Sequence, residues 1–411
     1  MLAQNEIVDL DSGGQARAER LLGRGGGGTA FLATDLATGK KAVLKEAHEI
    51  TPEGAKRLRH LVAHSRDIQT ACIALYSPYD CLTSGSLVSL SPFAPGQTLE
   101  SLLAAYDATF VEALQLSLAI SHLVCCLHRL RIVHGDLHPG NVLVIREGNV
   151  LKCYLIDFEN FTHSGVPRPP LLGRIDYLAP ELFKALSQGQ PAVPDIASEL
   201  FSLGVMFHEI LLVKHPTAGR DRTEKEHEKA LNSGWIHDPA RADRVSGQTP
   251  GFPSSVLDMS LMRLFRRSLS VDPKERVSAA DWVDAFTRLL YPSPRIEQCD
   301  ACQGPYVIEA SRFMCPSCGY STLLKLVGTF GGLELRQGIT YIGRGNLGGS
   351  QSVSDRHAVI RRHGSIYTLQ NLGRNGTYRW DGGWVAITDQ YAIRKGDRLL
   401  FANVEARVAQ L

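Results

Sequence analysis

The spacing of apolar residues changes along the chain, and this change limits the possible folds more than any other feature. From residue 15 to about 290, strand-like and helix-like segments alternate, which is typical of an α+β domain. From residue 326 to the end, short alternating runs are separated by Gly, Asn and Asp, which indicates an antiparallel β-sandwich. A breaker cluster at residues 291–294 divides the two patterns. We therefore predict a multidomain α+β chain with three parts: 15–290, 291–325 and 326–411.

Charge and hydrophobicity exclude several classes of protein. The 411 residues include 44 Lys and Arg against 42 Asp and Glu, so a net charge of +2 provides no global field for nucleic acid or an anionic membrane. Hydrophobic residues make up 44%, which argues against a disordered chain. The first residues carry acids where a secretory signal would be basic and then apolar, and no run of 18 uninterrupted apolar residues occurs. We expect a cytoplasmic protein with reduced cysteines and no nucleic-acid or membrane partner.

Three segments carry residues suited to binding a nucleotide. Gly23, Gly25 and Gly28 form a GxGxxG pattern that lets backbone amides approach phosphate oxygens. Strand-like residues flank them, whereas a dinucleotide-binding fold needs such glycines to open a helix. Lys45 ends the segment AVLK, and Asp157 ends the apolar segment YLID, where an acid is costly unless it meets a cation such as Mg²⁺. Taken singly, the glycines also fit a flexible turn and Lys45 a surface position.

The segment HGDLHPGN, in which four residues separate Asp136 from Asn141, completes an ordered set that resembles the serine/threonine protein kinases. The resemblance covers about 270 residues and implies a bilobal domain that uses ATP and Mg²⁺. It implies that Asp136 takes the proton of the substrate hydroxyl and that Lys45 orients the phosphates. It also implies that Asn141 and Asp157 bind Mg²⁺.

The same resemblance implies further binding and structural roles. The three glycines would cover ATP, and backbone groups of Pro92 and Ala94 would meet adenine. Glu181 of the APE triplet and Arg276 of the segment DPKER resemble the ion pair that supports the large kinase lobe. We expect this pair to be structural rather than catalytic.

The chain departs from the kinase pattern at several positions. Gly135 replaces the arginine that reads a phosphorylated activation loop, so we do not expect loop phosphorylation to switch the protein on. His138 replaces a lysine that neutralises the transferred phosphate, and Glu159 replaces the glycine of the DFG motif. Arg174 stands where serine/threonine kinases usually have threonine, and Glu199 where they usually have aspartate.

These departures leave alternatives open. The acid that pairs with Lys45 is Glu53, Asp67 or neither. An active protein kinase is the first hypothesis, which the retained catalytic residues favour. A pseudokinase scaffold that captures phosphopeptides is the second. HGDLHPGN also resembles the aminoglycoside and choline phosphotransferases, so a small-molecule kinase is the third.

Four cysteines form two CxxC pairs separated by twelve residues: Cys299, Cys302, Cys315 and Cys318. Four thiolates at this spacing close a tetrahedral Zn²⁺ shell, whereas a disulfide conflicts with a cytoplasmic setting. A redox CxxC would need a nearby βαβ unit. We predict a structural zinc ribbon in which Gly304 and Gly319 relax the turns.

The last 86 residues carry the motifs GR, SxxH and NG in an order that resembles the forkhead-associated domain, a β-sandwich whose loops bind phosphothreonine peptides. The resemblance implies that Arg344 and Ser354 bond the phosphate, that Asn375 bonds the peptide backbone and that His357 braces the loop. An arginine fork with a hydroxyl suits a dianionic phosphate. This part has 11 Lys or Arg against six acids, a surplus of five that agrees with an acidic ligand.

The order of kinase, zinc ribbon and forkhead-associated domain resembles the kinase of the bacterial tellurite-resistance-linked phosphorylation triad. That resemblance implies two partners, a von Willebrand factor A protein and a metal-dependent serine/threonine phosphatase. The expected ligands are otherwise protein substrates and a phosphothreonine peptide.

Overall fold

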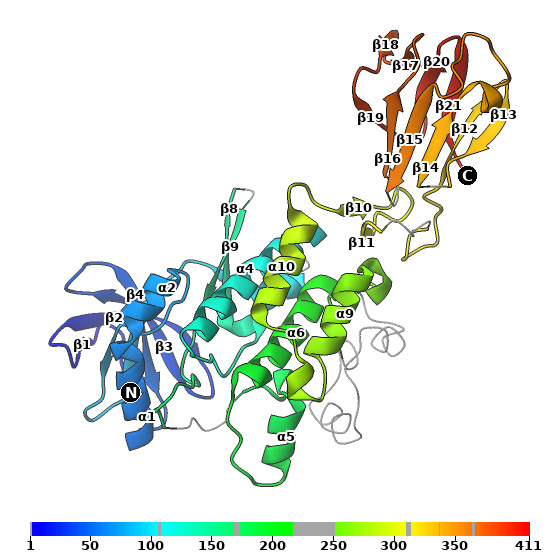
Figure 1. Ribbon diagram of the computed structural model, residues 1–411. Helices are drawn as coiled ribbons and strands as arrows, with labels where there is room; N and C mark the ends of the chain where they lie inside the picture. Colours follow the sequence, from blue (N-terminus) through cyan, green and yellow to red (C-terminus); the bar gives the residue numbers. More distant parts are fainter. Residues whose placement is uncertain are drawn as a thin grey trace. The chain divides into compact units, whose positions relative to one another are not determined.

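The computed structural model describes most of the chain, in these ranges: 2–105, 108–148, 150–167, 173–216, 251–309, 314–336, 338–363 and 366–411. The chain forms two compact units. The first unit comprises Met1–Ser254 and Met259–Ser293, and the second comprises Ser255–Asp258 and Pro294–Leu411. Each unit is described by itself below (Figure 1).

A six-stranded antiparallel sheet begins the first unit, in the order β1-β2-β3-β4-β6-β5. Its strands are β1 (Ile7–Asp9), β2 (Gln15–Arg24), β3 (Gly28–Asp35), β4 (Lys41–Ala47), β5 (Asp80–Leu82) and β6 (Val88–Pro92). Side chains alternate between faces, and Phe31, Leu44 and Leu90 meet in one buried cluster. Helix α1 (Pro52–Ala63) begins after Thr51, whose side chain accepts the N–H of Gly54, and α2 (Ser65–Ala71) follows it.

The rest of the first unit is mainly helical. Its helices are α3 (Leu99–Ala105), α4 (Phe110–Arg129), α5 (Pro180–Ser187), α6 (Ile196–Leu212), α9 (Met259–Ser268) and α10 (Ala279–Leu290). A small sheet consists of β7 (Gln97–Thr98), β8 (Val142–Glu147) and β9 (Val150–Leu155). The rings of Phe207, Phe265, Trp282 and Phe286 pack on one another between α6, α9 and α10. This aromatic cluster fixes the helices that support the site.

Helix α4 is long and apolar enough to cross a membrane by length and composition. Its most apolar window is, however, 61% buried inside the unit, and the helix packs against α6, α10 and β9 (Figure 1). Helix α4 is therefore a core helix of this unit.

The second unit joins a small two-stranded element to a β-sandwich. The element pairs β10 (Ile296–Gln298) with β11 (Pro305–Val307). One sandwich sheet has the order β13-β12-β21-β20-β17-β18 and the other β14-β15-β16-β19. Their strands are β12 (Leu324–Gly328), β13 (Gly331–Glu334), β14 (Ile339–Ile342), β15 (Ala358–His363), β16 (Ile366–Asn371), β17 (Thr377–Trp380), β18 (Trp384–Ala386), β19 (Gln390–Ile393), β20 (Arg398–Phe401) and β21 (Val404–Gln410). Leu326, Tyr367 and Phe401 belong to the core between the sheets.

Candidate functional site

Asp136 lies in the loop between α4 and β8, and hydrogen bonds hold this loop in shape. Asn141 ends the 3₁₀ turn η1 (Pro139–Asn141), and its Nδ2 donates to the backbone carbonyl of Asp136 at 2.9 Å. The N–H of Ile156 donates to the carbonyl of Asn141 at 3.0 Å, which ties the loop to the segment that carries Asp157. The bond to the Asp136 carbonyl uses the side-chain amide nitrogen of Asn141, so Oδ1 of Asn141 is the atom that can bind a cation.

Gly135 has a structural reason to replace the arginine of the kinase pattern. Its φ is +81°, and a Cβ at this position would lie 2.0 Å from the carbonyl oxygen of Asn160. Its N–H donates at 2.9 Å to Oε2 of Glu199, a buried residue of α6. The other oxygen of Glu199 lies 2.9 Å from Nε2 of His128. Glu199 thus holds the loop that carries Asp136 to α6 and α4.

His138 is buried beside Asp136 as a neutral imidazole. Its Nδ1 accepts the N–H of Gly140 at 3.0 Å, which places its proton on Nε2, and Nε2 lies 3.7 Å from Oδ1 of Asp136. Burial first, and then the electrostatic effects of Arg174 and His134, lower the pKa of His138 to about 4. His138 is therefore uncharged near neutral pH and cannot supply the cation of the lysine that it replaces.

Arg174 places a positive charge against the loop that carries Asp136 and Gly140. Its guanidinium pairs with Glu100 at 2.5 Å, and a Cβ on Gly140 would lie 3.1 Å from its Nη2. The hydrogen bond to Glu100 has the largest effect and raises the pKa of Arg174. The negative charge of Asp136 adds a smaller increase. A pocket opens here that is lined in part by Asp136, Gly173, Arg174 and Tyr177.

Lys45 on β4 reaches two carboxylates of the segment that follows β9. Its Nζ lies 2.9 and 2.8 Å from the two oxygens of Asp157 and 2.9 Å from Oε1 of Glu159. Burial lowers the pKa of Lys45, but the charges of Asp157 and Glu159 outweigh this effect and raise it. Lys45 is therefore a cation held between two acids.

Neither Glu53 nor Asp67, the two acids that the sequence offered as partners of Lys45, pairs with it in the part of the chain that the structure describes. Among the residues that the structure describes, the carboxylates paired with Lys45 belong to Asp157 and Glu159, and Glu53 and Asp67 lie elsewhere on α1 and α2. Glu159 is thus the second acid, at the position where the kinase pattern has glycine. From α1, Nη2 of Arg57 donates to the carbonyl oxygen of Glu159 at 2.7 Å.

The glycine run forms the turn between β2 and β3. The N–H of Gly25 donates to the carbonyl of Gly28 at 2.9 Å, and Gly23 lies on β2. A Cβ on Gly27 would lie 2.8 Å from Oε2 of Glu159, and one on Gly28 would lie 2.5 Å from the carbonyl oxygen of Glu46. The turn can therefore approach the Lys45 acids closely only because it lacks side chains.

Pro92 and Ala94 lie at the exit from the small-lobe sheet. Pro92 ends β6 and is paired with Ala42 of β4, and Ala94 is 5% exposed. Both residues thus lie in the segment that leaves the sheet on the strand next to the Lys45 strand. This location is compatible with the adenine contacts predicted for them.

The electrostatics of the loop region fit a bound cation. Burial raises the pKa of Asp136, the charge of His134 lowers it and the charge of Asp157 raises it, and the net effect is a raised pKa. Burial and the charge of Asp157 likewise raise the pKa of Glu159, against the opposite effect of Lys45. Asp157 itself has a φ of +66°, a left-handed conformation that a non-glycine residue adopts at a cost. Asn141 and Asp157 provide the oxygen donors that Mg²⁺ prefers.

Glu181 and Arg276 form the predicted contact between α5 and the loop before α10. Nη1 and Nη2 of Arg276 donate to the two oxygens of Glu181 at 2.6 and 2.7 Å. Arg276 has no exposed side-chain surface and also donates to the carbonyl of Ala197 at 2.9 Å. This bidentate pair ties α5 to the loop before α10 and to α6, which is compatible with the structural role expected for it.

The four cysteines converge in the second unit. Sγ of Cys299 lies 3.7 Å from Sγ of Cys318, and Sγ of Cys302 lies 3.7 Å from Sγ of Cys315. Four Zn–S bonds of about 2.3 Å at tetrahedral angles place sulfurs about 3.8 Å apart. The cluster is therefore compatible with Zn²⁺, and its four sulfurs leave no open position on the ion.

The turns of the cysteine cluster use a different residue from the one expected. Gln303 and Gly319, each directly after the second cysteine of a pair, have φ values of +59° and +74°. Gly304 has no positive φ, and a Cβ there would lie 3.3 Å from Sγ of Cys302. The expectation for Gly319 agrees with this geometry, whereas at the first turn Gln303 takes the left-handed conformation and Gly304 provides space.

The residues predicted to bind phosphothreonine gather at one loop end of the sandwich. Nε of Arg344 donates to the carbonyl of Val353 at 3.1 Å, beside Ser354, and its guanidinium lies 3.6 Å from Asp355. Nδ2 of Asn375 donates to the carbonyl of Ser352 at 2.7 Å, which joins the two loops.

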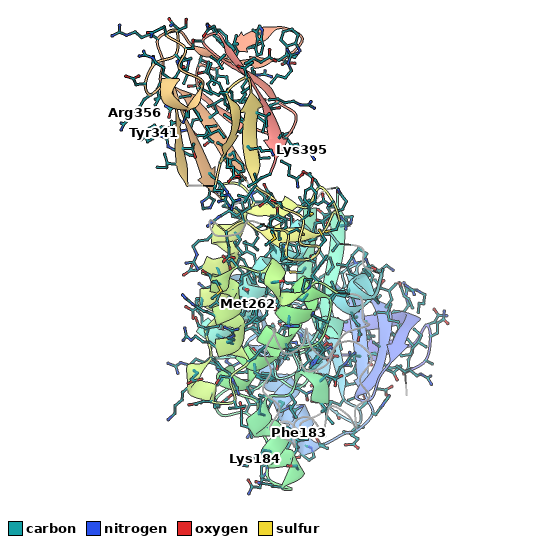
Figure 2. The ribbon with its side chains drawn as sticks, turned by 90° about the vertical axis from the view of Figure 1, so that its right-hand side faces the viewer. Phe183, Lys184, Met262, Tyr341, Arg356 and Lys395 are labelled. Atoms are coloured by element: carbon teal, nitrogen blue, oxygen red, sulfur yellow. The ribbon has the colours of Figure 1, made fainter. Side chains whose placement is uncertain are left out.

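His357 and Arg356 shape the same loops. The His357 ring is fully buried; its Nδ1 accepts the N–H of Ser354 at 3.3 Å, and its Nε2 lies 2.8 Å from the carbonyl oxygen of Gly376. His357 thus braces the loop that carries Ser354 against the one that carries Asn375. Arg356 lies 4.7 Å over the ring of Tyr341, and Figure 2 shows these two side chains together on the sandwich.

Comparisons with known families match both units. A family model described as a protein kinase domain matches residues 16–285, and one described as an FHA domain matches residues 340–402. These matches, together with the cysteine cluster of the structure, confirm the predicted fold class: a kinase domain, a cysteine cluster and a C-terminal all-β forkhead-associated domain. The three domain boundaries and the roles of individual residues stay predictions.

Curated relatives are similar to the first unit. The serine/threonine-protein kinase PknD of Chlamydia pneumoniae is 26% identical over 296 residues, which cover 63% of this chain and 29% of the relative. The serine/threonine-protein kinase PrkC of Bacillus subtilis is 22% identical over 295 residues, which cover 69% of this chain and 42% of PrkC. The chain therefore spans less than half the length of these relatives.

Proposed function

Because this chain belongs to the protein kinase family, we propose that it is an ATP- and Mg²⁺-dependent serine/threonine protein kinase that phosphorylates itself, partner proteins or both. The observation that supports this proposal most is the convergence of two elements distant in sequence. The side chain of Asn141 bonds to the backbone of Asp136, and Lys45 on β4 bonds to Asp157 after β9. The relatives named as serine/threonine-protein kinases support the substrate class.

The proposed reaction transfers the γ-phosphoryl group of ATP to a serine or threonine hydroxyl. The hydroxyl oxygen forms a bond to the γ-phosphorus as the bond from that phosphorus to the β–γ bridging oxygen breaks, and ADP leaves. The hydroxyl proton passes to the carboxylate of Asp136. Lys45 orients the phosphates, and Mg²⁺ held by Asn141 and Asp157 would neutralise their charge.

Arg174 takes over the positive charge that residue 138 lacks. His138 is neutral at physiological pH, whereas Arg174 packs on Gly140 of the same loop. Its ion pair with Glu100 orients the guanidinium, which is charged at all physiological pH values. A cation at this place stabilises the negative charge that spreads over the phosphoryl oxygens during transfer.

Two rival functions are tested by the same assays. Full-length chain is mixed with labelled ATP and Mg²⁺, with and without candidate partner proteins, and a thermal-shift titration is run in parallel. A kinase labels serine or threonine and gains thermal stability with ATP and Mg²⁺, because a ligand that binds the native state stabilises it. A scaffold shows neither effect. A small-molecule kinase labels a free aminoglycoside or choline and no protein.

Glu159 is expected to act as the positioning acid of Lys45. Replacing it with Gln (Glu159→Gln) should lower kcat/KM for ATP about tenfold, the low end for a charged hydrogen bond of about 1.5–3 kcal/mol, because Glu159 is 38% exposed and screened by solvent. Steady-state kinetics with varied ATP measures this. Glu53→Gln on α1 is the matched control and should keep the wild-type value. A loss in the control alone would reassign the acid.

The second unit is proposed to bind phosphothreonine peptides for docking or regulation. The FHA match and the loop end that carries Arg344, Ser354 and Asn375 support this. From the order of the three parts, we propose a von Willebrand factor A protein and a metal-dependent serine/threonine phosphatase as partners. The proposed location is the cytoplasm, whose thiols stay reduced for metal binding.

Replacing Arg344 with alanine is expected to weaken phosphothreonine-peptide binding about 100-fold. The arginine offers two charge-assisted hydrogen bonds to one phosphate, each worth about 1.5 kcal/mol or more. Fluorescence anisotropy with a labelled phosphothreonine peptide measures the Kd. Arg361→Ala, an exposed residue of β15 bonded to Gln370, is the matched control and should bind normally. Equal binding of the unphosphorylated peptide would contradict the proposal.

A further inference from the structure

Three histidines from two separate segments meet beside α1. His60 lies in the last turn of α1, His64 caps the helix one turn later, and His163 lies on the segment that follows Asp157. One nitrogen atom of each ring lies within 4.8 Å of the other two. From this geometry we propose that His60, His64 and His163 form a binding site for a divalent transition-metal ion such as Zn²⁺.

The three rings have to rotate from their positions in the structure to accept an ion. Nε2 of His60 and Nδ1 of His163 are 2.9 Å apart. Bonds of about 2.0–2.1 Å at tetrahedral angles place imidazole nitrogens about 3.3 Å apart. This pair therefore has to separate by a few tenths of an ångström, and the nitrogen of His64, which lies within 4.8 Å of both, has to reach the same spacing. Rotation of the three partly exposed rings is the movement that adjusts these distances.

A hydrogen bond orients His64 as it orients metal-bound histidines. Nδ1 of His64 lies 2.9 Å from the backbone carbonyl oxygen of His60 and so carries the proton. The lone pair is then on Nε2, the nitrogen left to bind an ion. Histidine ligands commonly donate their other N–H to a backbone carbonyl in this way. The His64 ring also stacks on the His60 ring, with centroids 4.3 Å apart.

His163 is held in place by its neighbours in sequence. Thr162 forms two backbone hydrogen bonds with Val133, of 3.0 and 2.9 Å, and its hydroxyl donates to the carbonyl of Pro194 at 3.0 Å. Phe161 is buried, and its ring stacks on that of His60 at 6.3 Å. The two residues directly before His163 are thus anchored in the fold, which lowers the entropy cost of ordering His163.

The donor set determines the class of ion and its effect. Three neutral imidazoles suit Zn²⁺, Ni²⁺ or Cu²⁺ rather than Mg²⁺ or Ca²⁺, which prefer oxygen. Three protein ligands leave a fourth position for water. A bound ion would tie α1 to the segment after Asp157, in addition to the bond from Arg57 to Glu159. The ion site is independent of the proposed kinase activity, and none of its ligands is among the proposed catalytic residues.

The test counts bound zinc in the full-length chain. Wild-type protein and variants are brought to equilibrium by dialysis against micromolar free Zn²⁺, and zinc per chain is measured by elemental analysis. We expect two equivalents in the wild type, one at the cysteines and one at the histidines. His163→Gln and His60→Gln should each retain one equivalent and bind the second at least about tenfold more weakly. His122→Gln, on an exposed position of α4, is the matched control and should retain two.

Cobalt separates the two sites by their spectra. A Co²⁺–thiolate centre has an intense sulfur-to-metal charge-transfer band, whereas a three-imidazole centre lacks it. In cobalt-substituted protein, His163→Gln should lose the absorption of the imidazole-bound cobalt. The thiolate charge-transfer band should stay unchanged. The proposal is overturned if the wild type holds one equivalent, or if His163→Gln keeps the second. Circular dichroism of each variant shows whether a loss comes from misfolding; if His163→Gln misfolds, the zinc content of His60→Gln decides.

Discussion

Replacing Asp136 with asparagine is expected to lower kcat by roughly 10²–10⁴-fold, the usual contribution of a positioned general base. Asparagine has the same shape, and the backbone carbonyl that accepts Nδ2 of Asn141 remains. ATP binding should therefore change little. Phosphoryl transfer to a partner protein measures kcat, and a thermal-shift titration with ATP and Mg²⁺ measures binding.

The pH dependence of the same pair of proteins identifies the base. Burial raises the pKa of Asp136, and the charge of Asp157 adds to this against the opposite effect of His134. Because the base acts only when deprotonated, wild-type kcat should fall as the pH drops through a pKa above the ordinary value for aspartate. The Asp136→Asn variant should lack this acid limb. Asp284→Asn, on an exposed position of α10, is the control; wild-type kcat in Asp136→Asn would refute the assignment.

Sequence reasoning predicted the parts of the site in which chemistry imposes short spacings. Asp136 and Asn141 share one loop, so their separation in sequence reflects their contact in space. The two CxxC pairs are equally local, and their sulfurs converge as predicted. Family motifs with a fixed order also predicted the fold class, because each motif occupies one element of that fold.

Contacts between distant segments were harder to predict. Lys45 and Glu159 form an ion pair although they are 114 positions apart in sequence. Nothing in the spacing of β4 and β9 indicates this contact. The structure shows a further contact between distant segments, because Arg57 of α1 donates to the backbone carbonyl of Glu159. Backbone conformation was similarly hidden, since Gln303 rather than Gly304 takes the left-handed turn. The residue type indicates which backbone conformations a position prefers. It does not indicate the φ angle that the position takes in the folded chain.

Removing zinc is expected to unfold the residues around the cysteine cluster and to leave the sandwich folded. A structural Zn²⁺ site contributes an apparent binding free energy of about 10–16 kcal/mol at pH 7. In a small zinc module this free energy stabilises the folded state. The region near β10 and β11 buries few apolar side chains of its own, Tyr306, Val307 and Ile308 among them. The sandwich has a separate buried core that includes Leu369 and Phe401.

Hydrogen exchange with and without a chelator measures this difference. Amides of β10 and β11 should lose protection when zinc is removed, and those of β15 and β16 should keep it. Cys299→Ser should reproduce the effect of the chelator, because three sulfurs no longer close the shell. Cys125→Ser, on α4 and outside the cluster, is the matched control and should retain zinc. Unchanged protection of β10 and β11 without zinc would mean that side-chain packing alone holds this element, and the cysteines would then need another role.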